Sequence, residues 1–65
     1  MFPDQQTMNE ILQAFKTEPS IPKQYKENAR TGYEGNTYIV IGANTKFHVF
    51  YENGVYHFQM GSLFA

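Results

Sequence analysis

The sequence predicts an α+β fold, in which one or two N-terminal helices pack on a three-stranded antiparallel β-meander. Two observations support this prediction. Apolar residues recur at helical spacing between residues 8 and 15, and three β-rich runs separated by turn-forming residues occupy residues 36–60. At 65 residues the chain is expected to form one small domain, 1–65.

The first helix is predicted to end near Lys16. Two residues compete to cap its start: Thr7, which with Glu10 matches a capping box, and Asp4, one turn earlier. The apolar residues at i, i+3, i+4 and i+7 form one stripe, which is expected to cover the aromatic face of the sheet. The stripe consists of Met8, Ile11, Leu12 and Phe15.

A second, shorter helix is predicted over residues 22 to about 29, with Gly32 as its stop. Lys23, Lys26 and Arg30 would then share one helix face. That basic face is either an ordinary solvated surface or a surface that contacts phosphate groups. The next residues, 33–35, are interpreted as a loop rather than as a fourth strand.

The pair Asn53-Gly54 is the strongest local signal, because both residues tolerate the positive φ that a type I′ hairpin turn requires. Side chains alternate between the faces of a strand, so this turn sorts the hairpin residues into two sets. The apolar set, expected to face the core, is Phe47, Val49, Tyr51, Tyr56, Phe58 and Met60. The mixed set, expected on the outer face, is His48, Phe50, Glu52, Val55, His57 and Gln59.

The first of the three strands, residues 37–43, allows two registers. A three-residue loop after it would place Ile39 and Ile41 in the core and Tyr38 and Val40 outside, whereas a two-residue loop at 44–45 would reverse these faces. We favour the first arrangement because Ile is more often fully buried than Tyr. The predicted core is Ile11, Leu12, Phe15, Ile39, Ile41, Phe47, Val49, Tyr51, Tyr56, Phe58 and Met60.

Enzymatic chemistry is not expected. The chain has no cysteine, its six acidic residues are scattered, and no glycine-rich phosphate loop is present. His48 and His57 are expected as diagonal neighbours on the outer face, where two imidazoles could meet a metal ion. Glu52 can approach His57 but not both histidines, so a third ligand is missing. We therefore predict no catalytic residue, no metal site and no cofactor.

The apolar residues that remain on the outer face favour a non-enzymatic protein-binding module, because contiguous exposed apolar patches usually mark interfaces. The partner would be a second copy of the chain in a homodimer, or a larger protein that this one inhibits or regulates, as small proteins of phages and mobile elements do. The predicted interface residues are Tyr38, His48, Phe50, Val55 and His57.

The alternative is a small nucleic-acid-binding domain that uses the sheet aromatics together with the face formed by Lys23, Lys26 and Arg30. A formal net charge of −1 counts against it. The sequence has no apolar run of about 20 residues and no basic start followed by an apolar stretch, so we expect no membrane association and a cytoplasmic location. Leu63 and Phe64 are expected to dock on the core.

Overall fold

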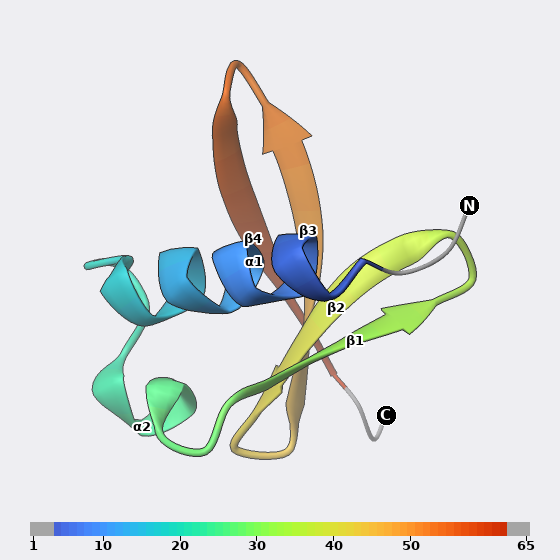
Figure 1. The fold of residues 1–65 in the computed structure, drawn as a ribbon. Coiled ribbons are helices and arrows are strands. Elements are labelled where there is room, and N and C mark those ends of the chain that lie inside the picture. Colours follow the sequence, from blue (N-terminus) through green and yellow to red (C-terminus); the bar gives the residue numbers. More distant parts are fainter. Residues whose placement is uncertain (1–3, 63–65) are drawn as a thin grey trace.

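The computed structural model describes residues 4–62 and confirms the α+β class, with one more strand than predicted. The elements are α1 (Gln5–Thr17), α2 (Lys23–Lys26), β1 (Arg30–Glu34), β2 (Thr37–Gly42), β3 (Thr45–Glu52) and β4 (Val55–Ser62). The strands form one antiparallel meander in the order β1-β2-β3-β4, and α1 lies across one face of it (Figure 1). The predicted docking of Leu63 and Phe64 falls outside the described residues.

Helix α1 is capped by Asp4, the earlier of the two candidate caps. The Asp4 carboxylate accepts hydrogen bonds from the backbone N–H and the hydroxyl of Thr7, at 3.2 and 2.9 Å. Thr7 therefore lies inside the helix instead of capping it. At the other end, Pro19 disfavours a helical conformation for Glu18, which is extended and ends the helix.

The predicted stripe of α1 packs on the sheet. Ile11 and Phe15 are fully buried. The Phe15 ring meets the rings of Phe47 and Phe58 edge to face, with centroids 4.9 and 5.2 Å apart. Such aromatic pairs stabilise a core by about 0.5–1.5 kcal/mol beyond the area that they bury. This cluster therefore holds the helix layer to β3 and β4.

The second helix is shorter than predicted. It ends at Lys26, and the backbone then reverses at Asn28, whose φ is +60°. Asparagine adopts this left-handed conformation more readily than most residues. Ala29 is buried, and Arg30 already belongs to β1. The prediction of one helix face with Lys23, Lys26 and Arg30 is therefore wrong.

Strand β1 occupies part of the stretch that was interpreted as a loop. Tyr33 pairs with Tyr38 and Glu34 with Thr37, which leaves Gly35 and Asn36 as a two-residue turn. Gly35 has a φ of +62°, while Asn36 is not in the positive region. A positive φ at the first turn position only is typical of a type II′ hairpin. The interpretation of residues 33–35 as a loop was wrong.

The register of β2 is also opposite to the one favoured from the sequence. The loop to β3 has two residues, Ala43 and Asn44, with φ values of +51° and +60°, as in a type I′ turn. Gly42 therefore pairs with Thr45, and Val40 pairs with Phe47 on the face that α1 covers. The assignment of Ile39 and Ile41 to the helix-covered core was wrong: they lie on the outer face. The helix-covered face instead receives Tyr38 and the fully buried Val40.

Gly42 brings α2 against the sheet. A Cβ atom at this position would lie 2.1 Å from the carbonyl oxygen of Tyr25, so only glycine allows the two backbones to approach this closely. The Tyr25 ring in turn meets Phe47, with centroids 5.5 Å apart. Through these two contacts the four residues of α2 close one end of the core.

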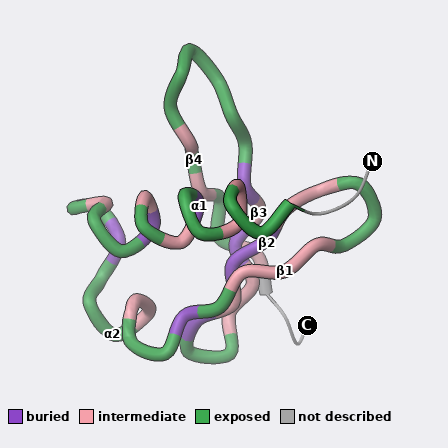
Figure 2. The backbone as a smooth tube through the Cα atoms, viewed as in Figure 1, coloured by how far each residue is buried: buried purple, intermediate pink, exposed green. Residues whose placement is uncertain are grey.

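The β3–β4 hairpin extends beyond the helix (Figure 1). β3 pairs with β4 along its whole length, but with β2 only from Thr45 to His48. We call the remaining two-stranded part, residues 49–58, the arm; apart from Val49, Tyr56 and Phe58 at its base and inner side, it is exposed (Figure 2). Two residues predicted in the core are exposed: Tyr51 on the arm, at 66%, and Met60 outside the arm, opposite Phe47, at 54%. They are on the predicted face, but α1 does not reach them.

Neither of the helices described between residues 4 and 62 is long and apolar enough to cross a membrane.

The Gly42 contact can be tested by substitution. Gly42→Ala should lower the free energy of unfolding by about 1–3 kcal/mol, because Tyr25 must move to admit the methyl group. Gly32→Ala is the matched control in a neighbouring strand, since its Cβ would lie 3.5 Å from Ile39, an ordinary contact. We expect the control to be neutral or slightly stabilising. Urea unfolding followed by circular dichroism measures both, and equal losses would show that the contact is unimportant.

Candidate protein-interaction surface

Exposed apolar side chains are concentrated on the β3–β4 hairpin. Within the described part of the chain, every large apolar residue classed as exposed lies on these two strands, at 49% to 66% exposure: Phe50, Tyr51, Val55 and Met60. Single exposed apolar residues are normal, but Phe50, Tyr51 and Val55 lie together near the hairpin turn, and such a cluster is typical of an interaction surface.

The outer side of the arm gathers most of the residues that the sequence marked as an interface. Phe50 lies directly opposite His57, and Val55 is paired with Glu52 at the next position on the same face. His48 is paired with Gln59, so it sits diagonally from His57, as predicted. The shared face of His48, Phe50, Val55 and His57 is confirmed; their role in an interface stays a prediction.

Tyr38 does not join this group. It lies on the helix-covered face, half-buried against the core, because β2 has the opposite register. Its hydroxyl accepts a hydrogen bond from the Asp4 backbone N–H at 3.2 Å, and its ring meets that of Tyr33 at 5.0 Å. Tyr38 therefore helps to anchor the start of α1. The placement of Tyr38 on the outer face was wrong.

The helix-facing side of the arm is aromatic as well. The rings of Tyr51 and Tyr56 are paired across the strands with centroids 4.8 Å apart. Burial, and to a lesser extent the negative charge of Glu10, raises the pKa of the Tyr56 phenol, which stays neutral near pH 7. Sequence reasoning placed Tyr51 and Met60 in the core and so missed them as surface residues. No local pattern in the sequence marks these two residues as exposed.

The outer face nearer the core has a polar cover. Lys46 of β3 and Glu34 of β1 form an ion pair of 2.7 Å. The strand between them is β2, where Ile39 lies on the same face and is only 7% exposed. The hydrogen bond and the charge of Lys46 lower the pKa of Glu34, with a smaller contribution from His48. The ion pair shields this part of the sheet, and nothing comparable covers the arm.

Metal ligands are few on this surface. Between residues 4 and 62, no three histidine or acidic side chains lie close enough together to hold a metal ion. His48 and His57 supply two imidazoles, and a protein metal site needs three or four ligands.

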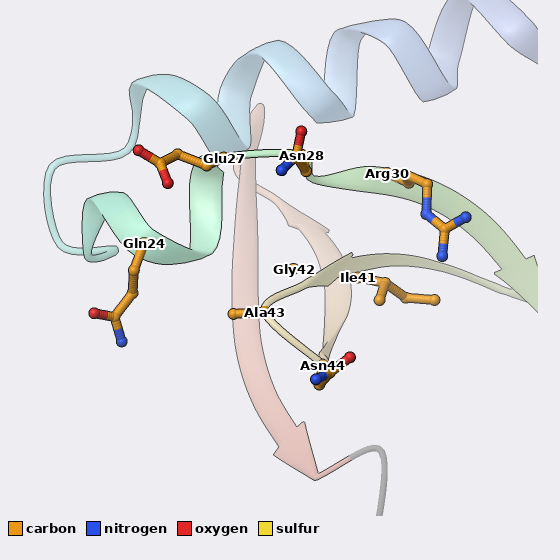
Figure 3. Close-up of a pocket in the computed structure, with 8 residues that line it drawn as sticks. All are labelled: Gln24, Glu27, Asn28, Arg30, Ile41, Gly42, Ala43 and Asn44. Atoms are coloured by element: carbon orange, nitrogen blue, oxygen red, sulfur yellow. The ribbon is translucent and has the colours of Figure 1, made fainter.

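Arg30, the first residue of β1, lines an open cavity of about 480 Å³ beside the β2–β3 turn (Figure 3). Neither Lys23 nor Lys26 lines this cavity. Its wall is mainly polar and includes one acidic residue, Glu27. Besides Arg30 and Glu27, the lining residues are Gln24, Asn28, Ile41, Gly42, Ala43 and Asn44. The three basic residues therefore do not share one helix face, and their contact with phosphate groups stays a prediction.

No protein-family model matches the sequence, and comparison with curated proteins and with solved structures gives no significant match. Function therefore has to be argued from the residues and their arrangement.

The Glu34–Lys46 pair makes a prediction about pH. Because the folded-state pKa of Glu34 is lowered from 4.5, its contribution to stability is present above that value and is lost as the pH falls through the lowered pKa. Lys46→Met keeps most of the stem but removes the charge, and should return the Glu34 pKa towards 4.5. NMR titration of the side-chain carboxyl carbons measures this, with Lys26→Met as the control. An unchanged Glu34 pKa in Lys46→Met would contradict the assignment.

Proposed function

We propose that this protein is a non-enzymatic protein-binding module that acts on a larger protein, as an inhibitor or regulator, through its arm. The observation that supports the proposal best is the position of the exposed apolar residues. Phe50, Tyr51 and Val55 lie on a two-stranded projection that extends past the only long helix among residues 4–62.

Apart from Val49, Tyr56 and Phe58, which contact the core, the arm residues add little to the packing of the folded monomer. A hairpin that serves only as structure usually has one apolar face on the core and one polar face in water. Here Phe50 and Val55 are about half exposed on the outer side, and Tyr51 is about two-thirds exposed on the other. Water contact with so much apolar surface is unfavourable, and burial against a partner would remove it.

The chemistry of the arm indicates the kind of contact. Aromatic side chains bury large areas and are favoured in the centres of protein interfaces. Phe50, Tyr51 and Tyr56 lie on a paired hairpin, so their backbone is already ordered and little backbone entropy remains to be lost on binding. The arm has one acidic residue, Glu52, and no lysine or arginine. Binding should therefore depend on shape and apolar burial, and only weakly on salt.

The nucleic-acid alternative has less support. Its proposed basic residues are divided between α2 and β1, and Lys46 is already engaged by Glu34. Phosphate binding would be strongly salt-dependent, which distinguishes it from binding by the arm.

Site-specific photocrosslinking in the cell that encodes the protein tests the proposal. A benzophenone amino acid at Val55, on the arm, should give a crosslinked species of discrete mass. The same group at Gln13, exposed on α1, is the matched control and should give none. The crosslink should survive a rise in salt concentration, because the arm carries little charge.

Phe50→Asp provides the second control. It should abolish the Val55 crosslink while changing the free energy of unfolding by less than about 1 kcal/mol, because Phe50 is about half exposed. Equal crosslinking from Val55 and Gln13, or a Val55 crosslink that persists in Phe50→Asp, would contradict the proposal. Unfolding by Phe50→Asp would show that Phe50 belongs to the core.

A further inference from the structure

The geometry points to a second interaction, which is independent of the faces of the arm. We infer that two copies of this chain associate along the outer edge of β4, in antiparallel orientation, to form one continuous eight-stranded sheet. The recognition chemistry is the row of backbone N–H and C=O groups on that edge.

The hairpin turn determines which backbone groups face outward. The pair beside a two-residue turn, Glu52 and Val55, exchanges both hydrogen bonds, and every second pair after it does the same. Tyr56, Phe58 and Met60 therefore direct their N–H and C=O groups away from β3. β4 is the last strand of the sheet, and no backbone hydrogen bond joins these groups to another segment of residues 4–62.

The β4 edge lacks the features that normally prevent edge pairing. Its eight residues include no lysine, arginine, acidic residue or proline. The opposite edge, β1, is shorter, at five residues, and has Arg30 at one end and Glu34 at the other. One edge is therefore protected and the other is open. Pairing through the open edge about a two-fold axis leaves neither copy with an unpaired β4 edge, so it produces a closed dimer instead of a fibre.

The side chains of β4 suit their own antiparallel image. Two-fold pairing of the outward groups brings Tyr56, Phe58 and Met60 opposite members of the same set in the other copy. Centred on Phe58, it places Tyr56 of one copy beside Met60 of the other, a favourable sulfur–aromatic contact. The pairing would also bury part of Met60, which is 54% exposed in the monomer. The strand is uncharged, so no like charges are brought together.

The connection between α1 and α2 lies near this edge at residues 56–58 but makes no backbone hydrogen bond to it. A cavity of about 150 Å³ lies between the connection and residues 56–58. The Glu18 carboxylate, which lines this cavity, accepts hydrogen bonds from the N–H and hydroxyl of Ser20. No side chain between residues 4 and 62 is hydrogen-bonded to the outward groups of β4.

Sedimentation equilibrium of the purified chain over a range of concentrations tests the inference. The wild type should show a monomer–dimer equilibrium. Met60→Pro removes one outward N–H without removing a bond to β3, and should weaken the dimer about tenfold or more. Met60→Ala is the matched control, because it shortens the same side chain but keeps the N–H. It should weaken the dimer much less.

Gln59→Lys is a second variant in case Met60→Pro does not fold. Its side chain is exposed, and the two lysines of a dimer would lie close together in an otherwise uncharged seam. It should also weaken the dimer about tenfold or more. A wild type that stays monomeric to about 1 mM, or a dimer unaffected by the variants that fold, would overturn the inference. Either result leaves the Val55 crosslink to a different protein as the separate test of the arm.

Discussion

The packing of Phe15 between Phe47 and Phe58 is the interaction on which the rest of the structure depends. It joins the only long helix of the described chain to the two longest strands. The helix has 13 residues and is therefore about 20 Å long, whereas the eight residues of β3 extend about 27 Å. Because α1 crosses the strands, it covers one zone of the sheet and leaves the far end of the hairpin without a layer above it.

This constraint divides the molecule into two zones with different properties. In the first, α1 and α2 bury one face, and the Glu34–Lys46 pair shields Ile39 on the other. In the second, aromatic residues on both sides of the arm face solvent, and the β4 edge remains open. A chain of 65 residues has little core with which to stabilise itself. Apolar residues placed on the arm are therefore better explained by binding than by folding.

The sequence predicted the parts of the fold that local chemistry determines. Asn53-Gly54 sets the hairpin register, and the spacing of Ile11 and Phe15 identifies the buried face of α1; both predictions are confirmed. β1 was missed although Gly35-Asn36 carries a comparable turn signal, because Gly32 and Gly35 on either side of Tyr33 favoured a loop. Asn28 was not recognised as the residue whose positive φ ends the second helix. These two errors concern signals that are present in the sequence.

Other errors concern features that no local pattern contains. Ile39 is buried, as its residue type suggests, but on the outer face, beside an ion pair formed by two other strands. The argument that Ile is buried more often than Tyr therefore selected the wrong register. Strand alternation placed Tyr51 and Met60 on the correct face but could not show where the helix ends above it. The same limit applies to the candidate site: the outer-face group was predicted, and the exposed residues of the inner side were not.

Amide hydrogen exchange, measured at a concentration where the protein is monomeric, tests the two-zone structure most directly. The N–H of Phe47, in the pair with Val40 beneath α1, should exchange only on global unfolding. The N–H of Val55 is also hydrogen-bonded, but it lies at the tip of the arm and should exchange through local opening, at least about tenfold faster. Equal protection at the two positions would contradict the division into a packed zone and a free arm.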